Sequence, residues 1–144
     1  MTDAPNTGDV FWCKNFPGLH GNSDKSRYAV VISPPDRLPD ERGCYLVVPT
    51  SCSSLSAHVV KLPNKTDNPQ TTSGLPDPCV AVCDEYKLVD GGVLTTWIGD
   101  LRTPTVSLLQ DTVRGVVQQR MLEIKVRTNS SGSTAGPASS SGTL

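Results

Sequence analysis

Short apolar runs alternate with proline- and glycine-containing connections in the chain before residue 93. The runs are rich in valine and aromatic residues, which favour β-strands, and they cover residues 8–14, 27–33, 44–51, 57–63 and 79–90. The connections at 15–26, 34–43 and 64–78 are polar and carry prolines or glycines that interrupt strand ladders. With 12 glycines and 12 prolines in 144 residues, the sequence predicts five or six short strands. Pro49 is expected to end the third of them.

The periodicity changes after residue 102. Apolar side chains then recur every three or four residues, which is typical of an amphipathic helix; they are Val106, Leu109, Val113, Val116, Val117 and Leu122. From Thr128 onward serine, glycine and threonine dominate, a composition that favours disorder. We therefore expect a flexible leader over 1–7, one ordered domain over 8–127, and a disordered Ser/Gly-rich tail over 128–144.

The order of the predicted elements limits the fold class. A chain of this length has room for one core, and five or six short strands followed by a helix fit a small, strongly bent barrel. We therefore expect a mainly β protein with a C-terminal α-helix. Trp12, in the first predicted strand, is expected to lie inside the barrel.

The charge and cysteine content narrow the function classes. The net charge of −1 does not suggest a general nucleic-acid binder, although Lys14, Lys25 and Arg27 place a local positive charge around the first loop. The five cysteines are an odd number, and reduced thiols are the simplest account. Cys79 and Cys83 lack a second pair of zinc ligands nearby in the sequence. We therefore expect no metal and no cofactor.

The sequence contains no sign of a membrane segment. It has no run of about 18 apolar residues, the length that a membrane-spanning helix needs. Its first ten residues, "MTDAPNTGDV", have neither the basic nor the apolar segment of a signal peptide. We therefore expect a cytoplasmic protein with no membrane partner.

Polar side chains lie at the ends of three predicted strands. Arg27 opens the second strand, Thr50 and Ser51 close the third, and Asp84 and Glu85 follow the first half of the fifth. Because each apolar run brings a polar group to one end, we expect a common site. The alternative readings are a surface ion pair for the arginine, a turn for the hydroxyls and solvated carboxylates.

The order of the motifs resembles that of a known family. The motifs are "GDVFWCK", "SRYAVVIS", "VVPTS", "HVVKLP", "GLPDPCVAVCDEYKLVD" and "IGDL", the last leading into the terminal helix. Together, over about residues 8–125, they resemble the PemK/MazF toxins, the mRNA interferases of bacterial type II toxin–antitoxin systems. The resemblance implies an SH3-like barrel, a homodimer, metal-independent cleavage of single-stranded mRNA, and neutralisation by a cognate antitoxin.

Three matching positions concern the phosphate. Arg27 matches the arginine of the family's Arg-Pro pair, with Tyr28 in place of the proline, and Thr50 and Ser51 match its hydroxyl pair. The resemblance implies that Arg27 stabilises the crowded phosphorane, since a planar guanidinium can hold two phosphoryl oxygens. Thr50 is expected to act with it in catalysis, while Ser51 and Lys25 are expected to bind RNA.

The other positions concern proton transfer and base binding. Asp84 matches the aspartate of an Arg-x-Asp motif in the PemK branch, with Val82 in place of the arginine, and His20 lies one residue out of register with a loop histidine. We expect Asp84 and His20 to be catalytic. Phe16 is expected to project from the first loop and stack on a base, and Glu85 is expected to contact the RNA.

Two other functions stay open at this point. The same barrel carries non-catalytic toxins such as the CcdB gyrase poisons, but these depend on a Trp-Gly-Ile helix end, whereas this helix continues through "MLEIKVRT". A decayed, inactive family member is the second alternative, because Tyr28 and Val82 depart from the family pattern.

Overall fold

The computed structural model describes residues 5–18, 25–33, 44–52 and 56–134, with side chains as far as residue 127. Within these residues the strands are β1 (Asp9–Phe16), β2 (Lys25–Val31), β3 (Cys44–Ser51), β4 (Val59–Lys61), β5 (Val80–Val82), β6 (Lys87–Asp90) and β7 (Thr96–Asp100), followed by the helix α1 (Thr103–Thr134). Short 3-10 helices, Cys83–Glu85 and Gly91–Val93, precede and follow β6. The chain divides into two compact units, residues 1–113 and 114–144, and α1 runs from the first into the second.

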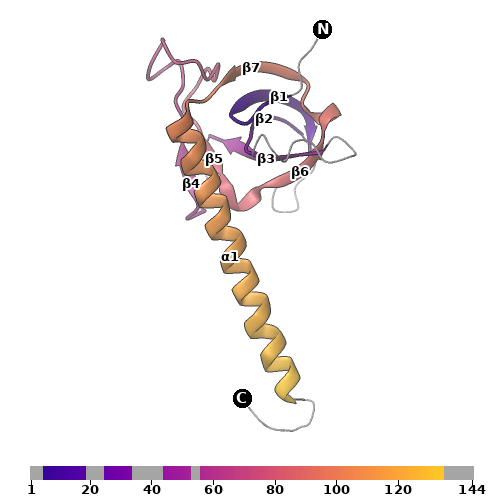
Figure 1. Ribbon diagram of the computed structural model, residues 1–144. Coiled ribbons are helices and arrows are strands. Elements are labelled where there is room, and N and C mark those ends of the chain that lie inside the picture. Colours follow the sequence, from indigo (N-terminus) through magenta and orange to yellow (C-terminus); the bar gives the residue numbers. More distant parts are fainter. Residues whose placement is uncertain (1–4, 19–24, 34–43, 53–55, 135–144) are drawn as a thin grey trace. The chain divides into compact units, whose positions relative to one another are not determined.

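All strand pairs are antiparallel. The sheet order is β4-β5-β3-β2-β1-β7, and β6 also pairs with β3. The run at 79–90, which is expected to supply a fifth and perhaps a sixth strand, contains two strands, β5 and β6, joined by the 3-10 helix. Figure 1 shows that the strands curl around one another rather than lying flat. The expected class, mainly β with a C-terminal helix, is confirmed.

Alternate residues of the central strands build the core. The buried cluster consists of Phe11, Cys13, Phe16, Ala29, Val31, Tyr45, Val47, Val89 and Leu94. Successive side chains of a strand point to opposite faces, so the residues between these core positions face the other way. Trp12 is one of them: it pairs with Tyr28 in the ladder and is only half-buried. The expectation that Trp12 lies inside the barrel is therefore wrong.

β3 continues through Pro49, where the sequence analysis expects it to end. The Ile32 amide donates to the Leu46 carbonyl at 2.9 Å, and hydrogen-bonded pairs alternate with non-hydrogen-bonded ones along an antiparallel ladder. The Ala29–Pro49 pair is therefore of the second kind, so the Pro49 nitrogen faces away from β2. On that side β3 is changing partner, from β6 to β5. The missing N–H removes no ladder bond, and the strand does not stop.

β7 has no counterpart among the predicted strands. It pairs with β1, with a register shift between Val10 and Phe11. A Cβ atom on Gly99 would overlap the backbone of Thr72 and Ser73, so only glycine lets this strand and that connection approach so closely. The strand depends on these distant contacts more than on its own short sequence.

The first turns of α1 follow the predicted pattern. Val106, Leu109 and Val113 are buried, and the Gln110 side-chain amide donates to the Ile32 carbonyl at 3.0 Å. Leu122, which the sequence analysis places on the same face, is 62% exposed. In the described part of the chain, no helix is both long and apolar enough to cross a membrane.

Both ends of the ordered domain differ from the predicted boundaries. Of the leader 1–7, residues 1–4 lie outside the described residues, while Asn6 and Asp9 exchange hydrogen bonds in a turn before β1. The helix continues over 128–134, which the sequence analysis assigns to a disordered tail. Serine and threonine have only modest helix penalties, so an existing helix can extend into them. Residues 135–144 lie outside the described residues.

Candidate functional site

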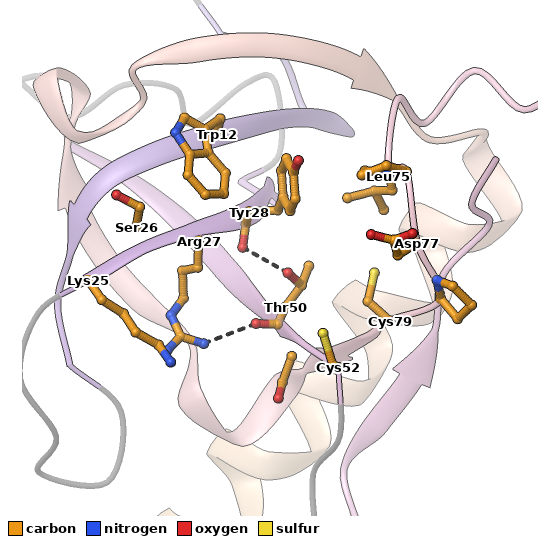
Figure 2. A pocket seen from close by; sticks show the side chains of 13 residues that line it. Trp12, Lys25, Ser26, Arg27, Tyr28, Thr50, Cys52, Leu75, Asp77 and Cys79 are labelled. Atoms are coloured by element: carbon orange, nitrogen blue, oxygen red, sulfur yellow. Dashed lines mark hydrogen bonds between the residues drawn. The ribbon is translucent and has the colours of Figure 1, made fainter. Parts of the chain in front are cut away.

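A cleft of about 340 Å³ lies between the strands β1–β3 and the connection that precedes β5 (Figure 2). Its walls are formed by Trp12, Lys25, Ser26, Arg27, Tyr28, Thr50, Ser51, Cys52, Leu75, Pro76, Asp77, Pro78 and Cys79. The structure thus brings together four of the predicted site residues, which are Lys25, Arg27, Thr50 and Ser51.

Arg27 is held in this cleft from β2. Its Nη1 donates to the Thr50 carbonyl at 3.1 Å, and the two residues come from neighbouring strands (Figure 2). Its Nε is buried and meets no hydrogen-bond partner among the described residues. Burial lowers the pKa of Arg27, but an arginine remains charged in proteins. The guanidinium is therefore fixed at one nitrogen and partly desolvated, a state that favours binding an anion.

Thr50 supports Arg27 rather than presenting a free hydroxyl. The Thr50 side chain is only 5% exposed, and its Oγ1 donates to the Tyr28 carbonyl at 3.2 Å. The hydroxyl proton is committed to that carbonyl, so the oxygen is left as an acceptor. Ser51 is half-buried beside it on the cleft wall.

Trp12 and Tyr28 form the aromatic part of the cleft. Their ring centroids are 4.8 Å apart with an interplanar angle of 62°, an edge-to-face pair of the kind that aromatic rings prefer. Both are half-buried and line the cleft. They are the available surface for stacking on an unpaired base.

Phe16, expected to stack on a base, is fully buried at the end of β1. A side chain without accessible surface cannot contact RNA, so this expectation is wrong. Strict alternation would place Phe16 on the same face as Trp12. The ladder is irregular between Cys13 and Phe16, and Asn15 has a positive φ of 57°. This bulge turns Phe16 into the core, and an asparagine, which tolerates that conformation, is the one local sign of it in the sequence.

The predicted carboxylates do not line the cleft. Asp84 and Glu85 lie in the 3-10 helix after β5, both half-buried, and Glu85 pairs with Lys87 at 3.8 Å. The carboxylate that does line the cleft is Asp77, which is exposed on the wall opposite Arg27 (Figure 2). Sequence reasoning missed it because "LPDPC" reads as an ordinary turn. His20 lies outside the described residues.

The cleft combines two cations, one carboxylate and an aromatic pair. Lys25 is exposed at its rim and can attract a phosphate backbone, while Arg27 can bind one phosphate closely. Among the described residues no group of three or more His, Cys, Asp and Glu side chains could hold a metal ion. The arrangement can therefore bind a phosphodiester with an unpaired neighbouring base and move a proton at Asp77.

The fold is that of MazF toxins. The crystal structure of MazF (Form-I) from Deinococcus radiodurans superposes with a TM-score of 0.62 at 15% identity, covering 81% of this chain and 99% of that chain. MazE-MazF (Form-II) from the same organism superposes with a TM-score of 0.60 at 15% identity, covering 81% and 98%. An endoribonuclease in complex with its cognate antitoxin from Mycobacterial species gives 0.57 at 13% identity, covering 81% and 96%.

The sequence agrees with the fold. A model of the PemK-like, MazF-like toxins of type II toxin–antitoxin systems matches residues 6–117. The chain belongs to this family. Among curated protein sequences, none matches the chain.

Proposed function

We propose that this protein is an endoribonuclease toxin that cleaves single-stranded mRNA without a metal ion. The observation that carries the proposal is the placement of Arg27, which the Thr50 carbonyl fixes in a cleft beside Trp12 and Tyr28. A partly desolvated guanidinium next to an aromatic surface suits a phosphate that is flanked by an unpaired base. The family membership supports the same activity.

In the proposed reaction a ribose 2′-oxygen attacks the adjacent phosphorus and expels the 5′-oxygen. Negative charge accumulates on the phosphoryl oxygens in the transition state. Arg27 is preorganised to stabilise that charge, and a single such donor typically contributes about 10²–10³-fold to the rate. Trp12 and Tyr28 hold the neighbouring base, and Lys25 with Ser51 contacts the backbone.

Proton transfer needs a group within reach of the 2′-hydroxyl. Asp77 lines the cleft across from Arg27, so we propose it as the proton acceptor. Asp84 and His20 are the candidates from the family pattern, but Asp84 does not line this cleft. Comparing Asp77→Asn with Asp84→Asn decides between the carboxylates. Asp77→Asn is expected to lower the cleavage rate by about 10²-fold or more. A larger loss of rate in Asp84→Asn would assign the role of proton acceptor to Asp84.

The test of the reaction is cleavage of a mixed-sequence RNA in EDTA. We expect products with a 5′-hydroxyl and a 2′,3′-cyclic phosphate or its 3′-phosphate, with Arg27→Ala as the control for a contaminating nuclease. Loss of cleavage on chelation and its recovery with Mg²⁺ would contradict the metal-free mechanism. A protein that arrests growth but cuts no RNA would favour the non-catalytic alternative, and one that does neither would be an inactive family member.

The proposal extends to partners. Two of the similar structures are, by their names, complexes of MazE with MazF and of an endoribonuclease with its cognate antitoxin. We propose that this protein is a homodimer in the cytoplasm and that a cognate antitoxin covers the cleft. Light scattering after size exclusion tests the dimer: a monomeric mass across micromolar concentrations would refute it. Co-purification with the antitoxin should abolish cleavage.

A further inference from the structure

Two cysteines lie opposite each other on the cleft wall. Cys52 directly follows β3 and is exposed, whereas Cys79 directly precedes β5 and is half-buried. The last pair in the β3–β5 register is Ser51 with Val80, so the next opposed pair is Cys52 with Cys79. Both residues line the cleft, and Figure 2 shows their side chains near one another, with Cys52 at the end of β3 and Cys79 on the connection that precedes β5.

The backbone geometry at this pair suits a disulfide. The Leu62 amide donates to the Cys79 carbonyl at 3.2 Å, so the polar backbone groups of Cys79 face β4 and not β3. Cys52 and Cys79 are therefore a non-hydrogen-bonded pair, in which Cα atoms are about 4.5 Å apart and side chains are closest. A disulfide needs Cα atoms about 4.4–6.8 Å apart. Continuing the β3–β5 register by one pair beyond Ser51 and Val80 gives that spacing.

The electrostatics agree with this closeness. Burial, together with charges on Cys52 and Asp77, raises the pKa of the Cys79 thiol to about 11. Because Cys52 is exposed and Cys79 is half-buried, a solute meets Cys52 first. The three remaining cysteines lie elsewhere: Cys13 and Cys83 are buried, and Cys44 is half-buried at the start of β3.

We propose that Cys52 and Cys79 are a redox modification site, at which exchange with a low-molecular-weight disulfide links the two residues and prevents the cleft from widening. With oxidised glutathione, the Cys52 thiolate attacks one sulfur, forms a mixed disulfide and releases one glutathione thiolate. The Cys79 thiolate then attacks the Cys52 sulfur and releases the second. The protein gives up two electrons and two protons, and the glutathione disulfide becomes two thiols.

The link joins the two sides of the cleft. One end lies next to Ser51 on β3, and the other belongs to the wall that carries Asp77. A bond of about 2.05 Å between the sulfur atoms stops this wall from moving away from β3 to admit RNA. The effect on catalysis rests on the proposed endoribonuclease function, and we expect the linked protein to cleave at least tenfold more slowly.

The experiment equilibrates the full-length protein in glutathione buffers of increasing oxidised fraction. One aliquot is alkylated, digested and mapped by mass spectrometry, and another is assayed for single-turnover RNA cleavage. We expect a Cys52–Cys79 linked peptide that increases in parallel with the loss of cleavage, and both are expected to reverse with dithiothreitol. Cys79→Ser should carry glutathione on Cys52 without a linked peptide, and Cys44→Ser, the matched control, should still form the link.

The mapping does not depend on RNA, so the two proposals fail separately. If the reduced protein cuts no RNA, the proposed function is wrong, while the mapping still decides whether the cysteines pair. If only glutathione adducts appear, or if other cysteine pairs link equally well, the site is refuted. A quantitative Cys52–Cys79 link with unchanged cleavage would refute the idea that the link blocks RNA by preventing the cleft from widening.

Discussion

Replacing Arg27 by lysine separates the geometry of the guanidinium from its charge. In the structure Nη1 donates to the Thr50 carbonyl at 3.1 Å, which leaves the other donors of the fork for a phosphate. A lysine at this position keeps the charge, but its ammonium is a strongly hydrated point charge without a planar pair of donors. If Arg27 stabilises the transition state as proposed, lysine should not rescue the loss caused by Arg27→Ala.

The expected magnitudes differ for catalysis and for stability. Loss of one transition-state donor lowers the rate by about 10²–10³-fold, or about 2.7–4 kcal/mol. We expect both Arg27→Ala and Arg27→Lys to reach at least the lower limit. The bond to the Thr50 carbonyl is a single hydrogen bond from a charged group at a half-buried position, so its removal should lower the free energy of unfolding by about 1–2 kcal/mol. Unfolding of the protein cannot then explain the lost rate.

Single-turnover rates at saturating enzyme, together with binding of a 2′-deoxy substrate analogue, give the two quantities needed. Lys25→Ala is the matched control, because the Lys25 side chain is exposed at the cleft rim. This variant should bind RNA more weakly, but its cleavage rate at saturating enzyme should stay within about threefold of the unmutated protein, because an exposed surface charge contributes little. Urea denaturation gives the stabilities. Near-wild-type cleavage by Arg27→Lys would refute the role of the fork and reduce Arg27 to an electrostatic tether.

Three further predictions concern stability. Gly99→Ala should lower the free energy of unfolding by about 3 kcal/mol, because the added Cβ would overlap a neighbouring backbone. Gly92→Ala, with open space around the Cβ, should change the free energy of unfolding by less than about 0.5 kcal/mol. Equal denaturation midpoints for the two variants would contradict the close packing at Gly99. The hydrogen bond from Asn64 lowers the pKa of Asp67 below 3.8, so this carboxylate stabilises the protein near neutral pH and loses that effect as the pH falls through the lowered pKa. Asp67→Asn should therefore reduce the loss of unfolding free energy as the pH falls from neutral to acidic. An unchanged pH dependence would refute the stabilising role of the Asp67 carboxylate. Removing residues 135–144 should leave the melting temperature and cleavage unchanged, because that segment is rich in serine and glycine; a clear drop in either would show that it packs on the protein.

The strands predicted from the sequence are those whose apolar residues are continuous. The valine-rich runs at 29–31 and 47–48 are buried within β2 and β3, and burial favours such continuous apolar runs. The prediction fails where one residue changes the local geometry. Asn15 shifts the register of β1 and turns Phe16 into the core, and Pro49 stays within β3 because a change of partner strand requires no N–H from it.

Half of the predicted site is assembled by the sheet, and that half was predictable. Arg27 and Thr50 lie on neighbouring strands, so a correct strand order brings them together. Asp77 and Cys79 reach the cleft through the connection before β5, whose path is set by tertiary contacts such as those at Gly99. No local pattern in the sequence encodes that path, so the opposite wall of the cleft could only be found in the structure.

Because β3 pairs with β6 along one half and with β5 along the other, the two halves should open locally to solvent to different extents. β6 is bonded along the first half of β3, from Cys44 to Val47, whereas β5 is only three residues long and meets β3 at Thr50 and Ser51. Amide protons in β5 should therefore exchange with solvent through small local openings, while those of β1 and β2 exchange only when the whole domain unfolds. If the cleft binds RNA as proposed, an opening at β5 admits the strand while the ladder between β1 and β2 stays intact.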